Sequence, residues 1–101
     1  MEGMELICFQ IISAVGMARS SFIEAIEFAK SRDFKQAEEA MKEGEEFFLQ
    51  GHHAHASLIQ KEANQEKVEF SLILMHAEDQ LMSAETFKIL AQQFIDLYQS
   101  L

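Results

Sequence analysis

The apolar residues of this chain fall into three stretches with the spacing of α-helices. The first, roughly residues 4–31, places an apolar or small residue at every seventh position: Cys8, Val15, Phe22 and Ala29. The second, roughly residues 34–63, does the same: Phe34, Met41, Phe48 and His55. Residues at this spacing lie on one face of a helix. With no Pro and only four Gly in the chain, the pattern predicts long, uninterrupted helices.

The second stretch contains two glycines, Gly44 and Gly51. Each helical Gly costs about 1 kcal/mol relative to Ala, so a break at either position is one interpretation. The seven-residue series keeps its phase across both glycines, which favours one continuous helix. In that case the small residues let a neighbouring helix come close.

Short polar segments separate the stretches. Ser31-Arg32-Asp33 reads as a turn in which Asp33 caps the second helix, with Gln36 as the reciprocal partner of a capping box. Asn64-Gln65-Glu66 reads as the second turn, with Asn64 as a cap. The third helix is then expected from about Lys67 to Ser100.

The third stretch differs from the others because its apolar residues surround most of the helix. Only one sector is consistently polar: Glu78, Glu85, Gln92 and Asp96. Two partner helices of a small chain cannot cover such a surface, so we expect an oligomer built around this helix. The predicted fold class is all-α, an antiparallel three-helix bundle, with residues 1–101 as a single domain.

Composition narrows the classes of function. The chain has 17 acidic and eight basic residues, a formal charge of −9, which argues against binding nucleic acid or an anionic membrane. No N-terminal signal pattern is visible and no apolar run looks long enough to span a bilayer, so we expect a soluble, cytoplasmic protein. Cys8 is the single cysteine, which excludes an internal disulfide and a CxxC site; packing is its expected role.

The stretch "LMHAEDQL", residues 74–81, holds the candidate chemistry. His76 and Asp79 differ by about 60° around the helix and about 4.5 Å along it. His76 is either a core histidine satisfied by its neighbours or a functional imidazole. Asp79 lies among apolar residues, where a carboxylate must be paired, metal-bound or protonated, unless it is in fact exposed.

A second histidine cluster, "HHAHA", places His52 and His55 at a spacing that can bind metal. Two ligands are too few for a structural site, and no Glu-x-x-His or HExxH pattern accompanies them. We expect His55 in or beside the bundle interior, and His52 and His53 nearer solvent.

Three segments carry a family resemblance: "EFAKSRDFKQAEEAMKEG" at residues 27–44, "AHASLIQKEA" at 54–63 and "EKVEFSLILMHAEDQLM" at 66–82. Together they resemble the lactose/cellobiose/chitobiose-type IIA component of the bacterial sugar phosphotransferase system. The resemblance runs over nearly the whole chain. It implies three-helix subunits that assemble into a nine-helix homotrimer.

The resemblance also implies a function. His76 accepts a phosphoryl group from phospho-HPr and passes it to a cysteine of the IIB component, during uptake of a β-linked disaccharide (cellobiose, chitobiose or lactose). Asp79 meets its two symmetry mates on the trimer axis, where a divalent ion, typically Mg²⁺, can sit among them. The alternative, from another class, is a non-catalytic trimeric scaffold or adaptor, which would have no need of His76.

Four residues share the side of His76 and are the expected phosphate or partner contacts: Leu72, Ile73, Gln80 and Ser83. Family members often read "HAQDH" where this chain reads "HAEDQ", so the chain departs from the family at Glu78 and Gln80. Gln80 can still donate a hydrogen bond to a phosphate. An ionised Glu78 cannot, but the helical spacing directs it away from His76.

Overall fold

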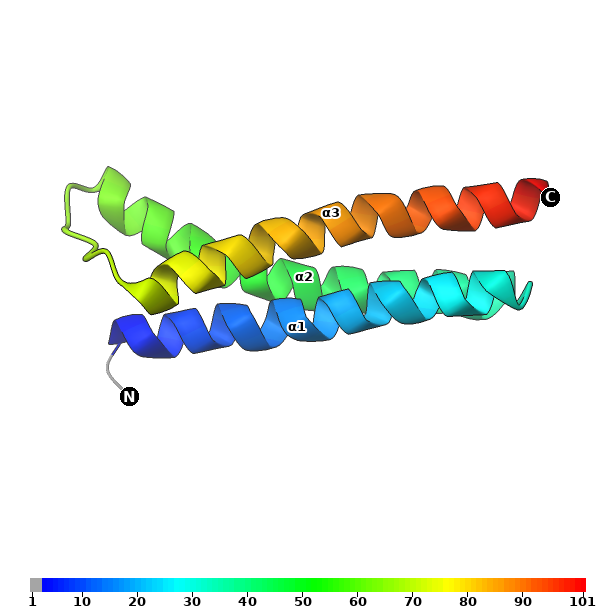
Figure 1. The fold of residues 1–101 in the computed structure, drawn as a ribbon. Helices are drawn as coiled ribbons and strands as arrows, with labels where there is room; N and C mark the ends of the chain where they lie inside the picture. Colours follow the sequence, from blue (N-terminus) through cyan, green and yellow to red (C-terminus); the bar gives the residue numbers. More distant parts are fainter. Residues whose placement is uncertain (1–2) are drawn as a thin grey trace.

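The fold is an elongated bundle of three helices, seen here in a computed structural model that describes residues 3–101 (Figure 1). The helices are α1 (Gly3–Lys30), α2 (Phe34–Ala63) and α3 (Leu72–Ser100). The bundle measures 51 × 23 × 19 Å. Helices α1 and α3 run in the same direction and α2 returns between them in sequence. The all-α, three-helix prediction is confirmed, and the described residues contain no strand.

Helix α1 supplies more of the core than either other helix because its apolar series faces both of them. Its four predicted positions are fully buried: Cys8, Val15, Phe22 and Ala29. One core cluster joins α1 to the middle of α2 and the first two-thirds of α3. A second, smaller cluster lies near the α1–α2 turn, where Ala25 and Ala29 pack close to Ala37, Ala40 and Ile95. The seven-residue pattern therefore identified the buried face of α1.

The glycines of α2 lie where α1 approaches most closely. The helix is continuous across both, as the phase of the apolar series predicted. A Cβ placed on Gly44 would lie 2.5 Å from the Phe22 ring, and one on Gly51 would lie 2.6 Å from Cγ1 of Val15. The absent side chains thus leave room for two of the largest buried side chains of α1.

We expect Gly44→Ala to destabilise the protein by about 1–3 kcal/mol, because the new methyl group overpacks against Phe22. Gly16→Ala is the matched control, since a Cβ at Gly16 meets no atom within 4 Å. That variant should gain up to about 1 kcal/mol from helix propensity. Urea denaturation at one protein concentration measures both. Equal effects of the two substitutions would contradict the close α1–α2 contact.

The first turn confirms Asp33 as the cap of α2, but the reciprocal half of the predicted capping box does not form, because the Asp33 N–H bonds to Phe28 and not to the Gln36 side chain. The Asp33 carboxylate accepts a hydrogen bond from the Gln36 N–H at 3.2 Å and caps α2. The chain reverses through Arg32, whose φ is +61°. The N–H of Asp33 bonds to the carbonyl of Phe28 at 2.9 Å, and that of Arg32 to the carbonyl of Ala29 at 3.0 Å, which closes α1 as a Schellman motif.

The second turn differs from the prediction. Asn64 ends α2 instead of starting α3, and Gln65 takes the left-handed φ of +63° in a second Schellman motif. Helix α3 begins at Leu72, five positions after the expected Lys67. The physical reason is Ser71, whose hydroxyl accepts the N–H of Leu74 at 3.2 Å and so provides the N-cap.

Helix α1 also differs from an expectation. By length and composition it is the one described helix that could cross a membrane, although no such run was predicted. The core helix of a soluble bundle passes the same test. Ile11, Val15 and Phe22 are buried against the rest of the chain, and 33% of the apolar window is buried in all.

Candidate functional site

His76 lies on the first turns of α3 and is exposed in the single chain. It borders an open apolar groove of about 610 Å³ between α3 and α1. Phe9 and Ile12 of α1 form one wall, and Leu72 and Ile73 of α3 form the other with His76. No side chain of residues 3–101 hydrogen-bonds to the His76 ring. Within the described chain His76 is therefore not a core histidine satisfied by its neighbours.

Gln80, one turn beyond His76, is fastened to α1. The Arg19 guanidinium donates a hydrogen bond to Oε1 of Gln80 at 2.5 Å, across a sequence separation of 61 residues. Both side chains are half-buried, as is Ser83. Gln80 and Ser83 were predicted from the sequence as phosphate or partner contacts, whereas Arg19 was not. The available signal was a basic residue directly after Ala18, on the edge of the buried face of α1.

Asp79 is exposed and is not among the residues that line the groove. Helical spacing places Met75, Met82 and Leu90 on the same side of α3, and these residues are exposed too, at 46%, 64% and 48%. The described residues of one chain contain no group of three potential metal ligands. A metal ion at Asp79 would therefore need carboxylates from further copies of the chain.

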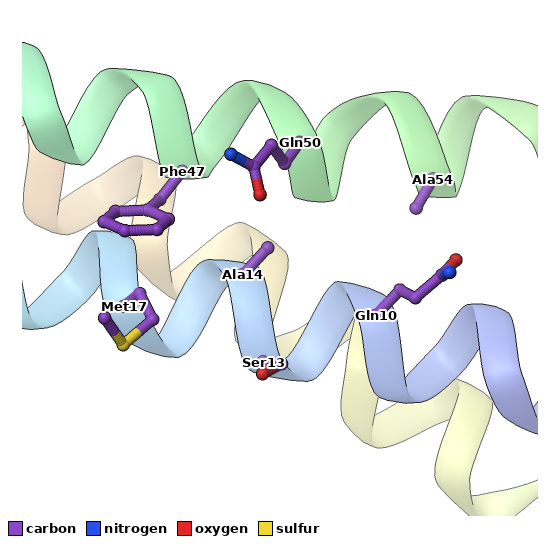
Figure 2. Close-up of a pocket in the computed structure, with 7 residues that line it drawn as sticks. All are labelled: Gln10, Ser13, Ala14, Met17, Phe47, Gln50 and Ala54. Carbon is purple, nitrogen blue, oxygen red and sulfur yellow. The ribbon is translucent and has the colours of Figure 1, made fainter.

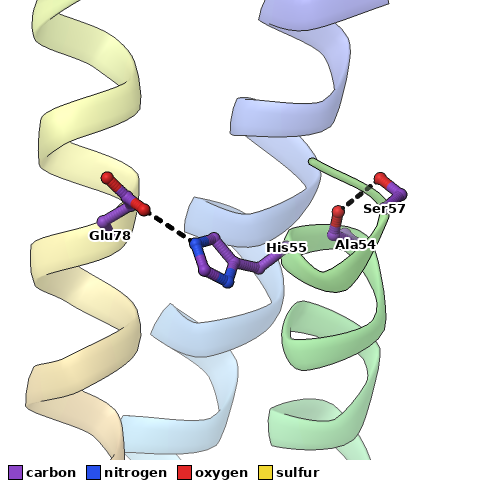
Figure 3. Close-up of polar contacts among 4 residues, drawn as sticks. All are labelled: Ala54, His55, Ser57 and Glu78. Atoms are coloured by element: carbon purple, nitrogen blue, oxygen red, sulfur yellow. Dashed lines mark hydrogen bonds and ion pairs between the residues drawn. The ribbon is translucent and has the colours of Figure 1, made fainter. Parts of the chain in front are cut away.

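Glu78 points the other way, toward α2 (Figure 3). Its Oε2 lies 2.8 Å from Nε2 of His55, which is the predicted histidine beside the bundle interior. His52 and His53 are exposed, as expected. Because Glu78 occupies the ring nitrogen of His55, this pair ties α2 to α3, and Glu78 is not a phosphate contact of His76.

Cys8 is buried in the core, in agreement with a packing role. Burial raises the pKa of its thiol above the ordinary value of 9.0, and the negative charges of Glu78 and Glu5 raise that pKa further. A thiol that keeps its proton is a poor nucleophile. Cys8 is therefore excluded as the reactive group of the site.

We expect native Cys8 to react with iodoacetamide at pH 8 at least about tenfold more slowly than Cys8 of the urea-unfolded chain. The raised pKa also predicts a pH dependence. The folded state retains the thiol proton above pH 9.0, where the unfolded thiol loses it, so stability falls as the pH rises past 9.0. Cys8→Ala is the control and should lack this component of the alkaline loss. Equal alkylation rates would contradict the burial.

A second groove, between α1 and α2, has a volume of about 380 Å³ (Figure 2). The residues that line it carry amides, one hydroxyl and apolar groups: Gln10, Ser13, Ala14, Met17, Phe47, Gln50 and Ala54. These groups offer neither a nucleophile of useful basicity nor a charge for an anion. The groove beside His76 is the candidate site.

The fold and site define an all-helical protein that presents an unbonded imidazole beside an apolar groove. Residues 6–99 match the family described as the lactose/cellobiose-specific IIA subunit of the phosphotransferase system (PTS), and the chain belongs to this family. The chain is 44% identical over 100 residues to the lichenan-specific phosphotransferase enzyme IIA component of Bacillus subtilis, covering 99% of this chain and 91% of that protein. It is 34% identical over 98 residues to a lactose-specific EIIA component of Staphylococcus aureus, covering 97% and 95%.

Solved structures agree with this assignment. The cellobiose-specific enzyme IIA of Bacillus anthracis superposes with a TM-score of 0.96 at 47% identity, over 99% of this chain and 92% of that one. The IIA(Chitobiose) chain from the Escherichia coli complex with HPr gives a TM-score of 0.84 at 29% identity, over 99% and 97%. The three-helix architecture is therefore that of known IIA subunits.

Proposed function

We propose that this protein is a phosphocarrier that accepts a phosphoryl group from phospho-HPr on His76 and transfers it to a cysteine of its IIB component. The observation that carries the proposal is the exposed, unbonded imidazole of His76 at an apolar groove. The complex of HPr with the E. coli chitobiose relative supports the choice of donor. The motif match at residues 66–82 supports His76 as the acceptor.

Phosphoryl transfer to and from His76 depends mainly on how the reacting groups are positioned. In the neutral imidazole that carries its proton on Nδ1, the lone pair of Nε2 attacks phosphorus while the bond from phosphorus to HPr breaks. In the second step a IIB thiolate attacks phosphorus, and the P–N bond to His76 breaks. Phosphohistidine is itself a high-energy species, so the protein's part is alignment and charge stabilisation.

The walls of the groove suit that task. Leu72 is 80% exposed on the single chain and Phe9 is 44% exposed, so both are available to a docked partner. Covering this apolar surface around His76 excludes water, which slows hydrolysis of the phosphohistidine. Ile73, Ser83 and Gln80 complete the surface that a partner or phosphoryl group would meet.

We further propose that three chains assemble around α3 into a homotrimer of nine helices. The support is the apolar surface that α3 leaves exposed: Leu72, Met75, Met82, Ile89, Leu90, Phe94 and Leu97. Such an area is larger than scattered surface residues account for. In this assembly the Asp79 carboxylates of three chains meet and hold a divalent cation, for which Mg²⁺ suits a hard, all-oxygen donor set. The cation offsets the mutual repulsion of the carboxylates.

The transported sugar is proposed from the relatives. Those similar proteins are named for lichenan, lactose, cellobiose and chitobiose. These names point to a β-linked disaccharide as the transported sugar. The chain would act in the cytoplasm during uptake of that sugar. A trimeric scaffold without transfer activity is the competing function.

The test is incubation with radiolabelled phosphoenolpyruvate, enzyme I and HPr. We expect one phosphoryl group per chain, labile in acid and stable in base as a phosphohistidine is, and its discharge on addition of a IIB protein. A chain that takes up no label from active phospho-HPr would support the scaffold and end the phosphocarrier proposal.

A further inference from the structure

The contact between Arg19 and Gln80 places a cation next to the candidate site. Arg19 lies on α1 and Gln80 on α3, and their hydrogen bond crosses the same α1–α3 interface that forms the His76 groove. Gln80 follows His76 by four residues, which puts it on the same side of α3, about 6 Å further along the axis. The Arg19–Gln80 pair therefore lies at the same interface, about one helical turn beyond His76.

Helix geometry favours a direction of the Arg19 side chain that leads toward His76. Long side chains on a helix lean toward its N-terminus. Because α1 and α3 run parallel (Figure 1), the N-terminal direction of α1 leads from Arg19 back toward Ile12, which lines the groove with His76. By this general preference the guanidinium is expected to lie on the His76 side of the Arg19 Cα.

The contact with Gln80 leaves most hydrogen-bond donors of the Arg19 guanidinium unused. A guanidinium has five N–H groups, and the contact with Gln80 uses one of them. Among residues 3–101, the ion pairs involve Lys30, Lys42, His55, Lys67 and Lys88, and none involves Arg19. Its charge is therefore not neutralised by a carboxylate of the described chain.

The same hydrogen bond orients Gln80. Its Oε1 accepts from Arg19, so the carboxamide NH₂ is directed elsewhere and remains available as a donor. The remaining N–H groups of Arg19 and the NH₂ group of Gln80 are hydrogen-bond donors. That is the chemistry that binds a phosphoryl group.

We propose that Arg19 is a phosphate-binding residue of this site, whose guanidinium, held by Gln80, contacts the phosphoryl group carried on His76. The proposal rests on the phosphocarrier function. A fixed cation beside the phosphoryl oxygens favours their dianionic form and stabilises charge during transfer in both directions. It also gives the acidic chain, with its formal charge of −9, a local attraction for the incoming anion.

The test is the pH titration of the ³¹P NMR signal of the phosphorylated full-length protein. The second ionisation of a phosphoryl group falls near neutral pH, where the signal reports it directly. We expect Arg19→Met to raise the pKa of that ionisation by about half a unit or more. We also expect Arg19→Met to slow transfer to the IIB component about tenfold. Arg19→Lys keeps the charge and should restore most of the phosphoryl pKa.

Arg32→Met is the matched control. It removes the only other arginine, which bonds to the Tyr98 carbonyl at the opposite end of the bundle, and should leave both readouts unchanged. Gln80→Met removes the anchor without altering Arg19 and should raise the phosphoryl pKa by a smaller amount; it also replaces Arg19→Met if that variant does not fold.

Unchanged titration in the Arg19 and Gln80 variants would overturn the proposal while the phosphocarrier function stands. Absence of a phosphohistidine signal from the unchanged protein would overturn both. A merely structural role would lower the melting temperature of Arg19→Met without moving the phosphoryl pKa, and that result also counts against phosphate contact.

Discussion

Replacement of His76 by alanine is expected to abolish the phosphoryl label completely. The substitution removes the one nucleophile that lines the apolar groove, and the neighbouring side chains there are aliphatic or aromatic. The fold should be retained, because an exposed residue without hydrogen bonds contributes within about 0.5 kcal/mol to stability. The measurement is radiolabel incorporation from phosphoenolpyruvate through enzyme I and HPr, with circular dichroism to check the helices.

The three other histidines provide matched controls for this result. His52→Ala, His53→Ala and His55→Ala should each keep one labelled site per chain, although the last variant loses the contact to Glu78. Label that persists in His76→Ala would move the acceptor to another residue, with exposed His53 or half-buried His55 as the first to examine. The loss of label must therefore be specific to position 76.

Assembly is expected to produce the second large effect. Light scattering at neutral pH should give a mass about three times the 11.6 kDa of the chain. Asp79→Leu should preserve or strengthen that trimer, because an apolar side chain replaces mutually repelling carboxylates among exposed Met75 and Met82. The measurement is the concentration dependence of the scattering mass, with and without added Mg²⁺.

Asp96→Leu is the control for this change of charge. Asp96 also lies exposed on α3, where it accepts a hydrogen bond from Gln92 within the polar sector, and its loss should leave the assembly unchanged. A monomer at micromolar concentration would contradict the assembly around α3. If only the Asp79→Leu variant dissociates and the unchanged protein stays trimeric, the trimer requires the cation bound by Asp79.

The sequence predicted α1 and α2 well, because each of these helices has one apolar face and packs that face in the bundle core. Cys8, Val15 and Phe22 are buried in α1, and α2 continues through Gly44 and Gly51 because packing against α1 outweighs the helix-breaking tendency of glycine. The start of α3 was placed too early. The residues before it are apolar enough to extend the helical pattern, and only the Ser71 cap marks the true boundary.

The candidate site could be predicted only in part. A motif singled out His76, and helical spacing placed Glu78 and Gln80 on different sides of α3, where they contact His55 of α2 and Arg19 of α1. These two partners could not be foreseen. Contacts such as Arg19 to Gln80 depend on how two helices are rotated and shifted against each other, which no pattern within one helix contains.

The groove beside His76 has a consequence for kinetics. His76 lies at this open groove, and the His55–Glu78 pair links α3 to α2 (Figure 3). A donor and an acceptor that both reach the same imidazole must occupy it in turn, which gives ping-pong kinetics with no ternary complex. The residence time of each partner then sets an upper limit on throughput. A partner that docks more tightly stays bound longer and would slow phosphoryl transfer through His76.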